Sequence, residues 1–283
     1  MMRHRDVLHC ACAQLEHTPD SPDTLFNKHV AFLEEAQDGQ IDLTVFPETS
    51  LTGYPADGDA VRNSAIWADD PRLLALAQKC RHGYAVVGFV EHGRGGQFYN
   101  SIAWLHKGEV LKIYRKINLP TYGRLDEGKY FTAGKRTMTL DIDRHWICGG
   151  MICADSWDPG QLYLSAMRES TVLALPIAST KEGVGGGFSN EAGWDLVGRH
   201  TAMIYGLPIL MCNWTGPHLD MHFWGGSRIL GPDGTRYAHA GDDEALLTTE
   251  IAYADVIHAR QTMPTVRTLM PQLLQRELPG LLE

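Results

Sequence analysis

The sequence predicts an α/β fold built of layers, not a single purely parallel sheet. Short apolar runs alternate with amphipathic segments along the chain, a pattern typical of strands packed against helices. Some neighbouring apolar runs are separated only by short turn sequences, which favours hairpins and therefore antiparallel pairs as well. No repeat, low-complexity tract or Pro/Ser-rich linker divides the 283 residues. We therefore predict one domain over residues 1–262 and a C-terminal tail over residues 263–283.

The first half of the chain opens with an apolar run typical of a strand. A helix is predicted after Pro22, because apolar residues then recur at helical spacing. Asp70 and Pro71 are typical of the cap and first turn of a second helix, which we expect Gly83 to close. The dipeptide Lys107-Gly108 separates two runs that pair naturally as a hairpin. The strands predicted here cover residues 7–13, 42–46, 84–90, 98–106 and 109–114, with a glycine-rich turn at 93–96.

The second half repeats the alternation, with a strand at 146–152, a helix at 159–168, a strand at 171–175, a helix at 191–205 and a strand at 208–213. Three later strands, at 227–230, 236–239 and 245–251, are predicted to form a meander whose first turn lies at Pro232-Asp233-Gly234. The tail carries one apolar stripe, which either packs within the subunit or forms a subunit contact: Val266, Leu269, Met270, Leu273 and Leu274.

Composition and charge argue against several classes of protein. The chain carries 25 Lys and Arg against 34 Asp and Glu, a net charge of −9, which argues against a general nucleic-acid binder. No apolar run reaches the roughly 18–20 residues needed to cross a bilayer, so we expect no membrane partner. The first residues are too polar for a secretory signal, and six cysteines are too few for a disulfide scaffold. We therefore expect a cytoplasmic protein.

Cys153 stands apart from the other cysteines as a candidate nucleophile. It follows an apolar strand and precedes a predicted helix, so we expect an exposed turn near helix N–H groups that favours the reactive thiolate. The other five are predicted to be buried, and the first two lack a further ligand at zinc spacing: Cys10, Cys12, Cys80, Cys148 and Cys212.

A cysteine nucleophile needs a base and a group that stabilises the oxyanion. Glu48 follows the short apolar strand that ends at Phe46, and Lys116 follows the strand that ends at Tyr114. Taken singly, each is a surface charge beside a loop. Together with Cys153 they form three reactive groups, each at the end of a strand.

Three blocks of sequence resemble the nitrilase superfamily of carbon–nitrogen hydrolases. FPETSLTGYP, YRKINLP and GGMICADSW occur in this order and are similar to the Glu, Lys and Cys signatures of that superfamily. The likeness continues through TYGRLDEGKYFTAG, RHTAMIYGLPILMCNWTG and FWGGSRILGPDG, and covers about residues 7 to 260. The glutamine-hydrolysing domain of NAD synthetases is the most similar branch. We expect that domain to stand alone here, because no synthetase domain follows.

The resemblance implies an αββα sandwich that pairs into homodimers or larger homo-oligomers, with the tail in the contact. It assigns Glu48 as general base, Lys116 as oxyanion stabiliser, Cys153 as nucleophile and Glu127 as a second glutamate beside them. A carboxylate enclosed in a pocket can take up and return a proton near neutrality, and the N–H of Ala154 can be a second oxyanion donor. The implied reaction is hydrolysis of a small-molecule carboxamide through a thioester, with no metal or organic cofactor.

The sequence departs from the glutaminase pattern where the substrate would bind. Ala154 follows the nucleophile where that branch commonly has a glutamate, although Asp155, Glu182 or Glu191 could supply the missing charge. STKEGVGGGFSNE, residues 179–191, replaces a shorter proline-containing stretch and is either a pocket lid or a surface loop. The expected substrate-binding residues are Tyr54, Tyr122, Ala154, Trp157 and Ser179, and Trp194 could join them in an apolar pocket.

Several functions remain open at this point. A nitrilase would attack a C≡N carbon with the same three residues, and a free-standing glutaminase would supply ammonia to a separate synthetase. A non-catalytic scaffold disagrees with the intact Glu-Lys-Cys set. A papain-like Cys–His hydrolase is formally open, because the chain has 13 histidines, but no motif places any of them.

Overall fold

The computed structural model describes residues 4–18 and 22–281. Within these residues, two six-stranded sheets and a separate hairpin form the framework. The strands are β1 (Val7–Gln14), β2 (Leu43–Val45), β3 (Tyr84–His92), β4 (Phe98–His106), β5 (Glu109–Arg115), β6 (Met138–Asp141), β7 (Ile147–Gly150), β8 (Val172–Pro176), β9 (Ile209–Cys212), β10 (Thr215–His218), β11 (Met221–Trp224), β12 (Arg228–Leu230), β13 (Arg236–His239) and β14 (Ala245–Ala252).

The helices are α1 (Pro22–Asp38), α2 (Gly58–Ser64), α3 (Pro71–Lys79), α4 (Glu127–Tyr130), α5 (Pro159–Met167), α6 (Asn190–Tyr205), α7 (Tyr253–Thr262) and α8 (Pro271–Leu281). Short 3-10 turns lie at Arg94–Gly96, Cys153–Trp157 and Val266–Thr268. No helix within the described part of the chain is long and apolar enough to span a membrane.

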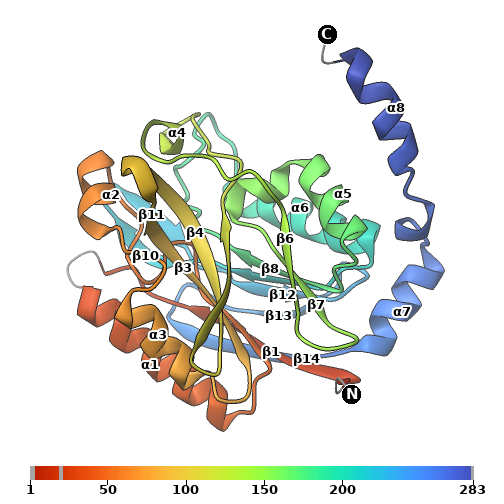
Figure 1. Cartoon of the computed structure of the whole chain (residues 1–283), viewed down its shortest axis with the longest axis horizontal. Coiled ribbons are helices and arrows are strands. Elements are labelled where there is room, and N and C mark those ends of the chain that lie inside the picture. The colour runs from red at the N-terminus through yellow and green to blue at the C-terminus, as the bar shows by residue number, and fades with distance from the viewer. Residues whose placement is uncertain (1–3, 19–21, 282–283) are drawn as a thin grey trace.

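Four layers make up the body of the molecule (Figure 1). The first sheet has the strand order β14-β1-β2-β3-β4-β5, and the second has the order β13-β12-β9-β8-β7-β6. Helices α1 and α3 cover the outer face of the first sheet, while α5 and α6 cover the outer face of the second. The fold is therefore the αββα sandwich that the resemblance implied.

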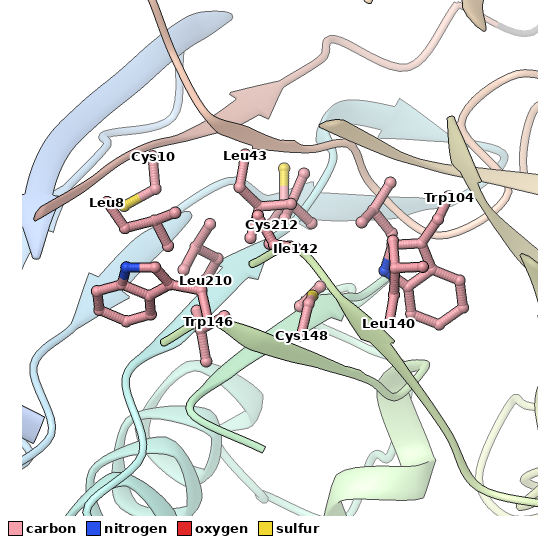
Figure 2. Close-up of a cluster of buried hydrophobic side chains, with 14 of the residues drawn as sticks. Leu8, Cys10, Leu43, Trp104, Leu140, Ile142, Trp146, Cys148, Leu210 and Cys212 are labelled. Carbon is pink, nitrogen blue, oxygen red and sulfur yellow. The ribbon is translucent and has the colours of Figure 1, made fainter. Parts of the chain in front are cut away.

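The alternation of side chains along each strand explains the layers. In β1, Cys10 and Cys12 enter the core between the two sheets, whereas Ala13 faces the helices. In β9, Cys212 faces the same inter-sheet core and Met211 faces α6. Both faces of these strands are buried, which is why they read as continuous apolar runs. Figure 2 shows the inter-sheet core, with Trp104 and Trp146 filling its two ends.

The predicted cysteine positions are confirmed. Cys10, Cys12, Cys148 and Cys212 are all buried between the sheets, and Cys80 is buried against the first sheet at the end of α3. Burial raises the pKa of Cys148 to about 11 and of Cys80 to about 12, because a thiolate there would lose its water. These thiols are inert core residues.

Two sequence predictions of local structure are wrong. Gly83 does not close α3, which ends at Lys79 with Cys80 as its cap. Instead Gly83 lies where the chain presses on the first sheet, and a Cβ there would sit 2.2 Å from the carbonyl oxygen of Ile41. The predicted meander also does not form, because β13 pairs with β12 in the second sheet but β14 crosses to β1 in the first. The turn at Pro232-Asp233-Gly234 is as predicted.

After α7, the tail leaves the layered body as a 3-10 turn and α8 (Figure 1). α8 contains no buried residue, and Met270, Leu273 and Leu274 expose 61%, 39% and 41% of their surface. An apolar stripe of this kind favours a partner surface, since it would otherwise stay in water. Residues 282–283, at the end of the tail, lie outside the described residues.

Deletion of residues 265–283 is expected to lower the assembly state. The deletion removes the apolar stripe, which we expect to contact a second subunit, so light scattering should report fewer subunits per particle than the intact chain gives. The double variant Leu273→Asp/Leu274→Asp provides a test without truncation, and should have the same effect. A particle mass unchanged in both would mean that the tail makes no subunit contact.

Candidate active site

Three reactive side chains meet at the ends of strands from both sheets. Glu48 follows β2 and Lys116 follows β5 in the first sheet, while Cys153 follows β7 in the second. Glu48 and Lys116 are completely buried, whereas Cys153 is partly exposed. The structure therefore brings together the three residues that sequence patterns had placed at strand ends.

Glu48 sits in a tight turn whose backbone is pressed against the neighbouring strand. Thr49 has a left-handed φ of 51°, and the indole N–H of Trp214 donates to the Glu48 carbonyl oxygen at 2.7 Å. Gly88 in β3 makes room for the turn, because a Cβ there would lie 2.3 Å from the Thr49 nitrogen. This close packing fixes the direction in which the Glu48 carboxylate points.

The Lys116 ammonium lies between two carboxylates. Its Nζ donates to Glu48 Oε1 at 2.6 Å and to Glu127 Oε1 at 2.8 Å. Burial alone would lower the pKa of Lys116, but Glu127 and Glu48 outweigh it and raise that pKa well above its ordinary value. The side chain is therefore a permanent positive charge inside the protein.

The two carboxylates have different partners. Glu48 Oε1 also accepts a hydrogen bond from Asn100 Nδ2 at 2.7 Å, while its Oε2 is buried with no hydrogen-bond partner among the described residues. Glu127 Oε1 accepts from the Tyr54 hydroxyl at 2.9 Å. Burial raises the pKa of Glu127 to about 7, with Lys116 opposing the shift and Glu48 adding to it. Glu48 thus keeps one oxygen free to accept a proton.

Cys153 begins the 3-10 turn with a left-handed φ of 46°, a strained conformation for a residue with a side chain. The Ser156 hydroxyl donates to its carbonyl oxygen at 3.0 Å. Burial raises the pKa of the Cys153 thiol well above its usual value, and repulsion from Glu48 adds to this, although Lys116 opposes it. The expectation of a ready thiolate is therefore wrong: this thiol needs a base to become a nucleophile.

Asp155 holds the nucleophile turn to the lysine strand. Its side chain is completely buried and links β5 of the first sheet to the turn that follows β7 of the second. The carboxylate accepts hydrogen bonds from donors on both segments: Ile117 N (3.0 Å), Asn118 N (2.7 Å), Ile152 N (3.0 Å) and the Tyr114 hydroxyl (2.7 Å). Asp155 therefore has no capacity left to meet a substrate charge. No local sequence pattern indicates this role.

A cavity of about 220 Å³ opens beside Cys153. Four of the predicted substrate-binding residues line it, namely Tyr122, Ala154, Trp157 and Ser179, together with Trp194. Tyr54 does not; it lines a second cavity beyond Glu127 and donates to that carboxylate instead. Among the described residues that line the Cys153 cavity, none carries a charged side chain, and neither Glu182 nor Glu191 is among them.

Ser179 contributes a hydrogen-bond donor to this cavity. Its Oγ accepts from the indole N–H of Trp194 at 2.9 Å and from that of Trp224 at 3.0 Å. A serine oxygen has two lone pairs, so both are occupied and only the O–H remains to bond with a ligand. Ser179 can therefore contact an acceptor atom but cannot accept from a donor.

Comparisons with known proteins identify the family of this chain. The family model described as "Carbon-nitrogen hydrolase" matches residues 9–261. A glutamine-dependent NAD(+) synthetase of Thermotoga maritima is 31% identical over 80% of this chain, which spans only 39% of that protein. A 2-oxoglutaramate amidase of Bacillus subtilis is 26% identical, covering 90% of this chain and 94% of that one.

The fold is also that of solved relatives. The crystal structure of a carbon-nitrogen hydrolase from Helicobacter pylori G27 superposes with a TM-score of 0.82 at 23% identity, covering 96% of this chain and 98% of the other. The family match extends over nearly the whole chain and includes all three strand ends that carry Glu48, Lys116 and Cys153. The chain belongs to the carbon–nitrogen hydrolase family.

Proposed function

We propose that this protein is an amidase that hydrolyses a small-molecule carboxamide through a thioester on Cys153. The observation that carries the proposal is the buried Lys116 ammonium, held by Glu48 and Glu127 where its charge also acts on Cys153. A fixed cation beside a thiol and a free carboxylate oxygen is the arrangement that acyl transfer to sulfur requires. The 2-oxoglutaramate amidase among the relatives supports the same reaction class.

In the first half of the reaction, Glu48 accepts the thiol proton while the Cys153 sulfur attacks the amide carbon. The electrons of the C=O bond move to oxygen, and Lys116 stabilises that negative charge together with the backbone N–H of Ala154. The C–N bond then breaks as Glu48 returns the proton to nitrogen. Ammonia leaves, and the acyl group remains on Cys153 as a thioester.

Water completes the cycle. Glu48 takes a proton from a water molecule while the water oxygen attacks the thioester carbon. Lys116 and the Ala154 N–H stabilise the second oxyanion as they did the first. The C–S bond breaks, the thiol regains the proton, and the carboxylic acid leaves. Glu127 orients Lys116 throughout by accepting a hydrogen bond from its Nζ, and the Tyr54 hydroxyl holds Glu127 in place by donating to the same carboxylate oxygen.

Glu48→Gln is expected to lower turnover by about 10³-fold and to trap the acyl-enzyme. Glutamine has no basic oxygen with which to activate water, so deacylation should suffer more than a slow acylation by a good substrate. Intact-protein mass spectrometry after mixing with butyramide should show the mass of the acyl group on Cys153. The double variant Glu48→Gln/Cys153→Ala is the control and should stay unmodified.

Two results would contradict this proposal. One is full activity of Glu48→Gln without an adduct. The other is activity that disappears with a chelator and returns with zinc, which would indicate a metal hydrolase. An ammonia-release screen over primary amides, nitriles and carbamoyl amines separates the amidase from a nitrilase, since only the latter would favour the nitriles.

Free glutamine is expected to be a poorer substrate than neutral amides. A charge-assisted contact to an ammonium contributes roughly 1.5–3 kcal/mol, about one to two powers of ten in specificity. Here Ala154 offers no charge, and the described lining of the cavity carries none. We expect kcat/KM for butyramide to exceed that for glutamine, and Ala154→Glu to reduce the difference. A tenfold preference of the native enzyme for glutamine would instead indicate a free-standing glutaminase.

A further inference from the structure

The segment between β8 and α6 forms a wall of the cavity beside Cys153. Gly183, Val184 and Phe188 line this cavity. Between them lie Gly185, Gly186 and Gly187, with φ values of 76°, 63° and 79° and no atom within 4 Å of where a Cβ would stand. Three consecutive left-handed residues form a turn that residues with side chains would adopt only under strain. The glycines therefore bend the chain outward and return it, so that Val184 and Phe188 both face the cavity.

Hydrogen bonds hold both ends of this turn in place. Glu182 Oε2 accepts from the His222 N–H at 2.9 Å, and the Gly183 carbonyl oxygen accepts from the Arg124 N–H at 2.9 Å. On the other side, the Phe188 N–H donates to the Gly185 carbonyl oxygen at 3.1 Å. The wall is thus tied to the β10–β11 hairpin and to the segment after Lys116.

Phe188 completes an aromatic cluster. Its ring lies 6.1 Å from that of Trp157, which lies 5.2 Å from that of Trp194 at nearly a right angle. Gly193 in α6 leaves the space that this needs, because a Cβ there would lie 2.6 Å from Phe188 Cζ. Phe188 and Trp157 nevertheless expose 43% and 37% of their surface. Their faces are apolar surface that a ligand could cover.

The cavity has the size and polarity for an aromatic ring. An engineered apolar cavity of about 150 Å³ binds benzene, and this one measures about 220 Å³. The additional volume suffices for a short link to the carboxamide at Cys153. We propose that Trp157, Phe188 and Trp194 form a subsite for the planar, uncharged tail of the substrate, which makes the substrate an aryl-substituted carboxamide. This inference rests on the proposed function and names its substrate class.

Activity of the Phe188→Ala variant provides the first test. Phe188→Ala should reduce kcat/KM for phenylacetamide about tenfold more than kcat/KM for acetamide, since an aromatic contact is lost only with the first. For Phe188→Leu, the ratio of kcat/KM for phenylacetamide to that for acetamide should lie between the values for the native enzyme and for Phe188→Ala. Leu196→Ala is the matched control, because Leu196 is an apolar residue of α6 that is 72% exposed and lies outside the cavity. An unchanged ratio of the two substrates in Phe188→Ala would overturn the inference.

Binding provides a test that does not depend on turnover. In the Cys153→Ala background, calorimetry should show phenylacetamide binding at least tenfold more tightly than acetamide, and Phe188→Ala should remove most of that difference. If the native chain releases ammonia from no amide yet this binding difference is found, the proposed function fails and the subsite stands. If amides are hydrolysed but Phe188→Ala changes neither the ratio of kcat/KM nor the ratio of affinities for the two amides, the subsite is contradicted and the proposed amidase function is retained.

Discussion

Cys153→Ala is expected to abolish amide hydrolysis, with a loss of at least about 10⁴-fold in kcat. The Lys116 amine cannot replace the thiol as nucleophile, because Glu48 and Glu127 hold it in its charged form. The fold should survive, since the partly exposed thiol sits in a turn and alanine meets the same left-handed φ of 46°. Thermal unfolding should show a change of stability of no more than about 1 kcal/mol.

Cys80→Ala is the matched control for this experiment. Cys80 is buried at the end of α3, away from the site, so its removal should cost some stability but leave ammonia release intact. Retained activity in Cys153→Ala would contradict the thioester mechanism. In that case histidine variants would be the next step, because a Cys–His or His-dependent hydrolase would then be in question.

The second large effect is expected from Lys116→Met, in stability as well as activity. The substitution removes the cation between two buried carboxylates, and breaking a buried charge cluster in this way costs about 3–5 kcal/mol at neutral pH. It also removes the positive charge that would stabilise the oxyanion, and this loss should lower kcat by about 10²–10³-fold. Urea unfolding and ammonia release would measure the two effects separately.

The loss of stability in Lys116→Met should depend on pH. In the native protein burial already raises the pKa of Glu127 to about 7, and Lys116 opposes that shift. Without the cation the pKa of Glu127 rises further, so the variant loses more stability than the native protein as the pH rises above the carboxyl's ordinary value. The difference in free energy of unfolding between the native protein and the variant should therefore be small near pH 4 and larger toward pH 8. Lys129→Met is the control: its ion pair with Asp126 is exposed, so its removal should leave the free energy of unfolding almost unchanged. Equal unfolding midpoints for Lys116→Met and the native protein at pH 8 would show that the cluster contributes nothing to stability.

Sequence patterns were sufficient to predict that the three candidate residues lie at strand ends, because each of them follows an apolar strand. Glu48 comes after β2, Lys116 after β5 and Cys153 after β7, and the apolar runs of those strands are visible in the sequence. The same patterns did not predict which strands share a sheet. β14 pairs with β1, more than two hundred residues away, and nothing in its composition distinguishes this partner from the adjacent β13.

The chemistry of the site was harder to predict than its location. A cysteine before a helix suggests a thiolate, but the fold buries Cys153 beside Glu48, and desolvation with repulsion outweighs the attraction to Lys116. Asp155 looked like a charge available to a substrate. Its real partners are backbone N–H groups from Ile117, Asn118 and Ile152, and such contacts between distant segments leave no local pattern in the sequence.

Because the site is divided between two sheets, the core between the sheets sets the distance between the candidate catalytic residues. Packed sheets lie about 10 Å apart, a distance set by the side chains between them. Here those side chains include Trp104, Cys148 and Cys212, while Glu48 and Lys116 follow strands of one sheet and Cys153 follows a strand of the other. Asp155 fastens the two halves at their edge. A change in core volume would therefore change the separation of the site residues. Substitutions in this core must preserve its thickness as well as its hydrophobicity if the site is to keep its geometry.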